Sequence, residues 1–181
     1  PRIMKRHAKL KLTKSQKSKA IWPNKEGEYA IYVDPTCHKD TKTATVLAQR
    51  QWKSDGYMPI EITHDKNKAN IVIEERVSKE KDKEGIMGET YRADTEWPDK
   101  RATIKINYQY IKKVGNYDDM VTTITHELDH GFGLGHNKDK NSLMSAYDDS
   151  DHRQTLPAKD IQKARGIYLA LEHYELKKTT K

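Results

Sequence analysis

Eleven residues in the second half of the chain combine histidine, glutamate and glycine at spacings that suit a metal site. Residues 126–136 read HELDHGFGLGH, which is the pattern HExxHxxGxxH. Successive residues of an α-helix are turned by about 100°, so His126 and His130 lie one turn apart and only ~40° apart around the axis. Both imidazoles can therefore reach one point in space, and the helix itself presets two metal ligands.

A third ligand requires the chain to leave the helix after His130. Gly133 stands where this must happen, and glycine enters the left-handed conformation of a helix end without a Cβ penalty. A bend at Gly133 would bring His136 round as the third ligand. Three neutral imidazoles about 2.0–2.1 Å from Zn²⁺ leave a fourth tetrahedral position for water, which is typical of a catalytic zinc ion rather than a structural one.

Glu127 is the candidate general base of this site. It is turned by about 100° from His126, beside the ligand face, so its carboxylate can contact a zinc-bound water without binding the metal. Zinc lowers the pKa of such a water towards ~7, and Glu127 would accept its proton, let the hydroxide attack a polarised carbonyl carbon, and pass the proton to the leaving amine. The alternative is a chance match. Five fixed positions in a chain with 8 His and 9 Gly make that roughly a 1 in 10,000 event.

The helix that carries the motif also needs a face that packs. Four apolar side chains lie about 160° round from the histidine pair on the same helical wheel. They are Val121, Ile124, Leu128 and Phe132. Asp118 and Asp119 suit an N-cap and a first turn, where free N–H groups and the helix dipole favour negative charge. These features predict a helix from about residue 118 to 132.

The surrounding sequence has the pattern of an α/β (α+β) domain over residues 26–181. Short β-branched and aromatic runs predict strands at 29–33, 60–63, 70–74, 85–92 and 102–107. Apolar residues at helical spacing predict a first helix over 43–54 that ends at Gly56, and a third helix begins at Pro157. The charged stretch 76–85 is expected to be a solvated loop. The prediction is five strands and three helices without an internal repeat.

The net charge of +7 comes entirely from the amino-terminal segment. Residues 1–25 contain nine basic residues and no acidic one, whereas the remainder has 25 basic against 27 acidic residues. The segment has no helical apolar stripe, so we expect a flexible arm. It is either a solvated tail or the remnant of a processed leader, or an arm that attracts an anionic polymer or nucleic acid.

Composition excludes several classes of protein. The 181 residues are 34% hydrophobic with a mean hydropathy of −1.02, and no run approaches the ~18 apolar residues of a membrane span. Cys37 is the only cysteine, which excludes an internal disulfide and a cysteine-based zinc site. We expect Cys37 to be a plain, partly buried thiol.

The histidine motif, followed by a methionine, resembles the metzincin metallopeptidases and most closely their matrixin branch. Ser142-Leu143-Met144-Ser145 is similar to the Met-turn of that family, in both its spacing from His136 and the apolar residue before the methionine. Residues 70–73 resemble the matrixins' third strand, residues 85–91 their edge strand, and residues 156–168 the start of their C-terminal helix. The resemblance covers roughly residues 28–170.

The resemblance implies a twisted five-stranded mixed sheet with three helices, and a zinc cleft between the edge strand and the Met-turn. Met144 would form a hydrophobic base under one catalytic zinc ion, and an extended peptide would pair with the edge strand. The resemblance implies these candidate cleft residues: Gly85, Ile86, Met87, Gly88 and Tyr147. Tyr147 would form a pocket wall or, less in keeping with its spacing from Met144, a further metal ligand. The resemblance also implies an extracellular, secreted protein.

Several positions depart from the family pattern. Residues 65–125 contain no histidine, so the second, structural zinc of matrixins is expected to be absent. Loop carboxylates could bind Ca²⁺ or simply be solvated. They are Asp82, Glu84, Asp94, Glu96 and Asp99. Asp160 is expected to hydrogen-bond the Met-turn, and Asp129 replaces the usual small residue without an explanation from sequence.

Three functions are compatible with the sequence. The first is a zinc endopeptidase that hydrolyses peptide bonds of proteins or peptides through a water activated by Glu127. The second is a binding module on the same scaffold, catalytically vestigial and tethered to anionic surfaces by residues 1–25. The third is a nucleic-acid protein, for which the basic arm is the sole support. The intact ligands and base favour the endopeptidase.

Overall fold

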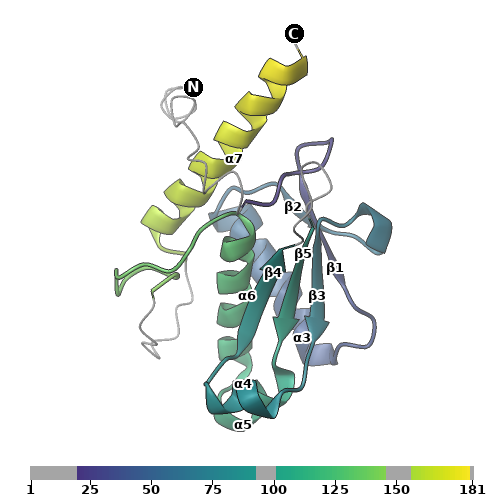
Figure 1. Ribbon diagram of the computed structural model, residues 1–181, viewed down its shortest axis with the longest axis vertical. Coiled ribbons are helices and arrows are strands. Elements are labelled where there is room, and N and C mark those ends of the chain that lie inside the picture. The colour runs from purple at the N-terminus through teal and green to yellow at the C-terminus, as the bar shows by residue number, and fades with distance from the viewer. Residues whose placement is uncertain (1–19, 93–100, 146–155, 180–181) are drawn as a thin grey trace.

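A five-stranded mixed sheet forms the centre of the computed structural model, which describes residues 20–92, 101–145 and 156–179 (Figure 1). The strands are β1 (Tyr29–Val33), β2 (Ile60–Ile62), β3 (Ile71–Glu75), β4 (Gly88–Arg92) and β5 (Ala102–Ile106), in the order β2-β1-β3-β5-β4. The four strands β2, β1, β3 and β5 are parallel, and β4 runs antiparallel to β5 at the edge. All five predicted strands are confirmed.

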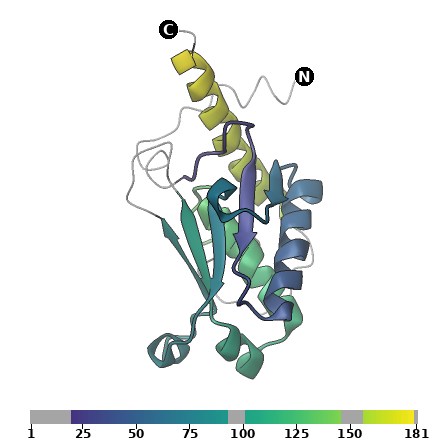
Figure 2. The same cartoon turned by 90° about the vertical axis from the view of Figure 1, so that its right-hand side faces the viewer.

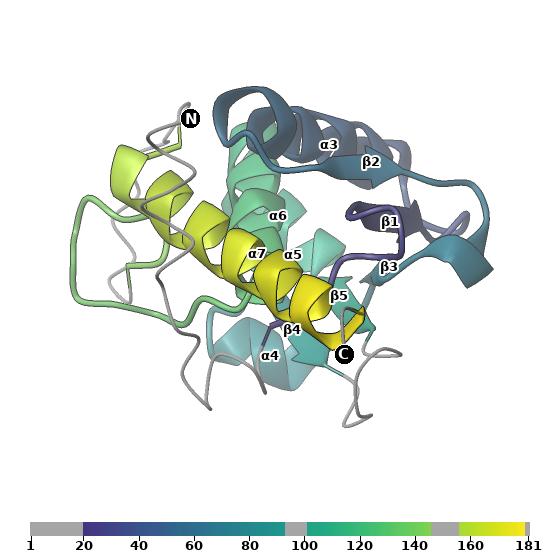
Figure 3. The same ribbon diagram turned by 90° about the horizontal axis from the view of Figure 1, so that it is seen from above.

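Three main helices complete the domain. They are α3 (Lys39–Arg50), α6 (Tyr117–Gly131) and α7 (Ala158–Thr179). Figure 2 shows α3 and α6 together on one side of the sheet, and Figure 3 shows α7 lying across one end of α6. Within the described residues, no helix is both long and apolar enough to cross a membrane. The predicted α/β class and the three helices are confirmed.

The details of several elements differ from the sequence prediction. The first helix begins earlier, at Lys39, and continues as a π-helical turn, Gln51–Asp55, up to Gly56. The expected loop 76–85 contains a short helix, α4 (Lys79–Lys83), because the Ser78 hydroxyl accepts from the backbone N–H of Lys81 and caps it. Another short helix, α5 (Tyr108–Val114), follows β5 directly and was not predicted.

The main core lies between the sheet and the helices α3 and α6. Trp52, in the π-helical turn, is fully buried, donates its indole N–H to the carbonyl of Thr125, and meets Phe132 edge to face at 5.0 Å between ring centroids. Isoleucines from β1, β3 and β5 fill the layer beneath them. This packing fixes the inner side of α6, so the outer side is free to carry polar chemistry.

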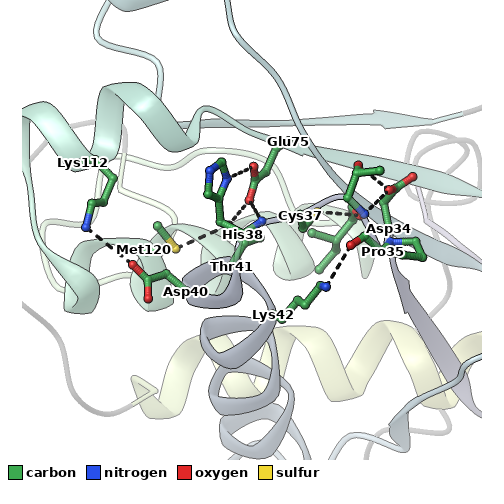
Figure 4. A network of polar contacts seen from close by, with 12 residues as sticks. Asp34, Pro35, Cys37, His38, Asp40, Thr41, Lys42, Glu75, Lys112 and Met120 are labelled. Atoms are coloured by element: carbon green, nitrogen blue, oxygen red, sulfur yellow. Dashed lines mark hydrogen bonds and ion pairs between the residues drawn. The ribbon is translucent and has the colours of Figure 1, made fainter.

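Glu75, at the end of β3, joins the sheet to the start of α3 (Figure 4). Its carboxylate accepts the backbone N–H of His38 at 2.6 Å and the hydroxyl of Thr41 at 2.7 Å. A negative charge at a helix N-terminus is favourable because the first N–H groups have no partner within the helix. Cys37 beside it is a buried free thiol whose pKa burial raises to about 12.

Residues 20–22 are packed into the domain, which corrects the expectation of an arm reaching residue 25. The backbone N–H of Ile21 donates to the carbonyl of Gly131 at 3.0 Å, and the Trp22 carbonyl accepts from Asn70. Ala20 and Trp22 form a second apolar cluster with residues of α7. Each of these side chains finds apolar partners far along the chain, which a local search for a helical stripe could not detect.

Candidate metal centre

Helix α6 begins with a reciprocal cap. The side chain of Asn116 accepts from the backbone N–H of Asp119 at 3.1 Å, and the Asp119 carboxylate accepts from the backbone N–H of Asn116 at 2.7 Å. Asp118 and Asp119 therefore stand in the first turn as predicted, while the N-cap is Asn116. The cap fixes where the helix starts, and so which of its residues face the sheet.

Gly133, the glycine of the motif, directly follows Phe132, the C-cap of helix α6. Gly133 has a φ of 108°, in the left-handed region, and its N–H donates to the carbonyl of His130 while the N–H of Leu134 donates to that of Asp129. This pair of bonds is a Schellman ending. A Cβ on Gly133 would lie 2.9 Å from the Cβ of Ala20, so the turn also depends on the packed segment 20–22.

The turn brings three imidazoles together as predicted. Nε2 of His136 lies 3.2 Å from Nε2 of His126 and 3.2 Å from Nε2 of His130. Tetrahedral ligands about 2.05 Å from a zinc ion would be about 3.3 Å apart. Within the described parts of the chain, this trio is the group of histidine, cysteine and acidic side chains that could hold a metal ion.

The donor set fits a cation. Nδ1 of His126 lies 2.8 Å from the carbonyl of Leu143, and Nδ1 of His130 lies 2.7 Å from that of Leu134. A carbonyl only accepts, so each Nδ1 carries the proton and each Nε2 directs a lone pair at the centre of the trio. Burial lowers the pKa of His126 and also that of His136, which favours the neutral, metal-binding imidazole.

Hydrogen bonds connect the predicted Met-turn to the histidines and to α7. The backbone N–H of Asn137 donates to the carbonyl of Met144 at 2.8 Å, which ties the residue after His136 to the buried methionine. Asp160 of α7 accepts from the hydroxyl of Ser142 at 2.6 Å and from the N–H of Leu143 at 2.7 Å. The predicted hydrogen bond between Asp160 and the Met-turn is confirmed.

Glu127 is on the histidine helix α6, and its side chain faces the edge strand β4. Its side chain is 5% exposed, and one carboxylate oxygen, Oε2, accepts from the hydroxyl of Thr90 at 2.5 Å. A Cβ added to Gly88 would lie 2.9 Å from Cγ2 of Thr123 and 3.2 Å from Cγ of Glu127. The edge strand therefore approaches α6 closely enough that glycine is needed at position 88.

Three of the other residues expected in the cleft lie directly before Gly88, at positions 85–87. Thr123 of α6 donates to the sulfur of Met87 at 3.8 Å, so Met87 and Gly88 both contact the histidine helix. Gly85 and Ile86 lie in the turn after α4, where their N–H groups donate to carbonyls of Asp82 and Lys81. These bonds connect Gly85 and Ile86 to α4. Tyr147 lies outside the described residues.

Of the acidic residues considered for calcium, the structure describes Asp82 and Glu84. The Asp82 carboxylate accepts from the side chain of Asn107 at 2.6 Å, and Glu84 forms an ion pair with Lys81 at 3.8 Å. Asp94, Glu96 and Asp99 lie outside the described residues. The described carboxylates are therefore engaged in hydrogen bonds and ion pairs within the fold.

Asp129, for which the sequence offered no explanation, is fully buried on α6, next to His130 in the chain. Neither carboxylate oxygen has a hydrogen-bond partner in the part of the chain that the structure describes. Burial, together with the nearby carboxylate of Asp160, raises the pKa of Asp129 well above its ordinary value and favours the neutral acid. A buried carboxyl group without a partner costs stability.

Sequence reasoning missed two kinds of participant in the site. The carbonyls of Leu134 and Leu143 orient the histidine rings, and backbone groups leave no signal in the residue types. Thr90 contacts Glu127, and here a signal existed. Thr90 stands two residues after Gly88, so both face the same side of a predicted strand.

The chain is similar to known proteins in its sequence pattern and in its fold. A family model described as Matrixin matches residues 21–169. The hatching enzyme zinc-protease high choriolytic enzyme 1 from medaka (Oryzias latipes) has a similar fold, with a TM-score of 0.51 and 12% identity over 88% of this chain and 98% of that chain. Archaemetzincin from Methanopyrus kandleri gives a TM-score of 0.42 and 13% identity over 83% of this chain and 98% of its own. No curated protein sequence matches. The likeness to the hatching enzyme shows a shared fold.

Proposed function

The chain belongs to the matrixin family, and from this premise we propose that it is a zinc-dependent endopeptidase that cleaves peptide bonds of proteins or peptides. The observation that carries the proposal is the convergence of three imidazoles. Nε2 of His136 lies 3.2 Å from Nε2 of both His126 and His130, and the neighbouring Glu127 is buried. Ligands and base come from one helix and one turn, so the fold holds them in fixed relation.

His126, His130 and His136 would hold one zinc ion. When bound, zinc supplies a Lewis acid that polarises a carbonyl group and lowers the pKa of a water molecule. Glu127 would accept the proton of the attacking water on its carboxylate and return it to the leaving amine nitrogen. Its burial against β4 keeps competing solvent away from that carboxylate. Met144 would support the metal from below.

The substrate would bind as an extended strand beside β4. In the sheet order, β5 pairs with one side of β4, and β4 is the terminal strand. An edge strand offers a row of backbone donors and acceptors to another chain. Met87 and Gly88, which lie against the histidine helix, would line the cleft, and Tyr147 would form a pocket wall. We further propose that the protein acts outside the cell, as its family relationship suggests.

Metal analysis combined with cleavage of a diverse peptide library tests this function. The wild-type chain is expected to bind one zinc ion and to cleave internal peptide bonds. Glu127→Gln should retain the zinc and lose cleavage, whereas His136→Ala should lose both. Unchanged cleavage by Glu127→Gln would refute the role of the base. A zinc-loaded wild-type chain that cleaves no peptide would favour a binding module on this scaffold instead.

A further inference from the structure

One hydroxyl group of the edge strand touches the candidate base at two points. Oγ1 of Thr90 lies 2.5 Å from Oε2 of Glu127 and 3.1 Å from the backbone carbonyl oxygen of the same residue. These residues are 37 positions apart in the chain, on β4 and α6. Because the contact includes both the backbone and the end of the side chain, it fixes the position of Glu127 along its whole length.

Gly88 extends this contact towards the middle of the glutamate side chain. Side chains two residues apart on a strand point to the same side, so positions 88 and 90 both face α6. At position 88, an added Cβ would lie 3.2 Å from Cγ of Glu127. The backbone of Gly88 therefore lies against the aliphatic part of the Glu127 side chain, and the hydroxyl of Thr90 contacts its carboxylate.

The chemistry of the contact assigns its direction. A carboxylate accepts hydrogen bonds, and a hydroxyl has one proton to donate. Because Oγ1 of Thr90 lies 2.5 Å from Oε2 of Glu127, the hydroxyl donates its proton to this oxygen and holds it against β4. The Thr90 hydroxyl therefore restricts how the Glu127 carboxylate can turn. A base works only when the proton that it accepts lies within hydrogen-bond reach, so its orientation matters as much as its presence.

Resting on the proposed function, we propose that Thr90 is a positioning residue for the base: its hydroxyl holds Oε2 of Glu127 and so fixes the orientation in which the carboxylate accepts a proton. Thr90 belongs to the same five-residue strand that would pair with the substrate. The peptide and the base are therefore both positioned by β4. A shift of this strand would misplace the scissile bond and the carboxylate together.

Kinetics of matched variants test this role. Thr90→Val keeps the shape and removes the hydroxyl, and it should lower kcat by about 10- to 100-fold with KM and zinc content unchanged. Thr90→Ser keeps the hydroxyl and should restore most of kcat. Thr123→Val, at the same interface between strand and helix, should behave as wild type. Wild-type kcat in Thr90→Val, equal losses in Thr90→Val and Thr90→Ser, or a change confined to KM would each overturn the proposal.

A second measurement does not depend on activity. In urea unfolding of the zinc-loaded chain, Thr90→Val should lower the midpoint in the wild-type background but not in the Glu127→Ala background, because the partner is then absent. Equal shifts in both backgrounds would show that no hydrogen bond couples the residues and would overturn the proposal. If the wild-type chain cleaves nothing, the endopeptidase function fails, and this cycle still decides whether Thr90 holds Glu127.

Discussion

The carboxylate of Asp160 accepts the backbone N–H of Leu143 at 2.7 Å, although 17 residues separate them. The carbonyl of the same Leu143 lies 2.8 Å from Nδ1 of His126. Asp160 thus acts on a candidate metal ligand through the two backbone groups of one intervening residue. Such indirect support orients a histidine ring and fixes which nitrogen faces the metal.

Asp160→Ala should therefore weaken zinc binding. The variant removes the acceptor for Leu143, so the Met-turn can move and its carbonyl no longer holds His126. We expect zinc affinity to fall about 10- to 100-fold, measured by competition with a chelator. Asp160→Asn retains one acceptor oxygen and should lose less. Wild-type affinity in both variants would show that the Met-turn orients His126 without Asp160.

Gly133→Ala should destabilise both the fold and the metal centre. At a φ of 108° an alanine is strained, and its Cβ would approach Ala20 to 2.9 Å. We expect a loss of about 2 kcal/mol in the free energy of unfolding, together with weaker zinc binding. Gly135→Ala is the control, because nothing lies within 4 Å of a Cβ there. Equal effects of the two substitutions in urea unfolding would contradict this account.

Gly88→Ala should separate the edge strand from the histidine helix. The new Cβ would lie 2.9 Å from Cγ2 of Thr123, and overpacking of this kind costs about 1–3 kcal/mol. We expect cleavage to fall because β4 and Glu127 move apart. Thr123→Ser removes the methyl group that would clash with the new Cβ. The double variant Gly88→Ala/Thr123→Ser should therefore recover stability and part of the activity. A double variant no better than Gly88→Ala would place the strain elsewhere.

Glu89 should make stability depend on pH in the acidic range. It lies on β4 within a cluster of donors: Arg76, Lys81 and Tyr91. Burial alone would raise its pKa, but these hydrogen bonds outweigh burial and lower it from 4.5 to about 2. A lowered folded-state pKa stabilises the fold above the unfolded value, and this contribution disappears as the pH falls from 4.5 to about 2.

The test compares the wild-type chain with Glu89→Gln in urea unfolding at several pH values. The variant should be less stable by about 2 kcal/mol at pH 7, and the difference should shrink steadily below pH ~4.5. Acid effects on the histidines are common to both proteins and cancel in the comparison. A difference that does not change with pH would show that the charge of Glu89 is not what stabilises the cluster.

Asp129→Ala should stabilise the protein. The carboxyl group is fully buried without a hydrogen-bond partner in the described residues, so its removal relieves a desolvation cost of about 1–3 kcal/mol. Alanine also favours the helical backbone. The exposed Asp118 in the first turn of α6 is the control, because Asp118→Ala loses a favourable contact with the helix dipole. Destabilisation by Asp129→Ala would indicate a partner for this acid.

Local features of the chain were predictable from the sequence because their causes are local. The spacing of His126 and His130 is a property of any α-helix, and Gly133 ends the helix through its own backbone freedom. Four of the five strands follow from short runs of β-branched and aromatic residues. The family resemblance rests on the same short motifs, and it anticipated the sheet, the main helices and the bond from Asp160.

The tertiary structure alone decided which distant residues meet. Ala20 lies against Gly133, and no local pattern marks this pair. The strand period puts Thr90 on the same side as Gly88, but only the fold shows that this side meets Glu127. The short helix α5 was missed because it is too short for a helical stripe, and it is fixed by burying Ile111. The orienting carbonyls likewise come from chain folding, since every residue carries one. The sequence indicated the candidate ligands and the candidate base, and long-range packing decided which neighbours hold them in place.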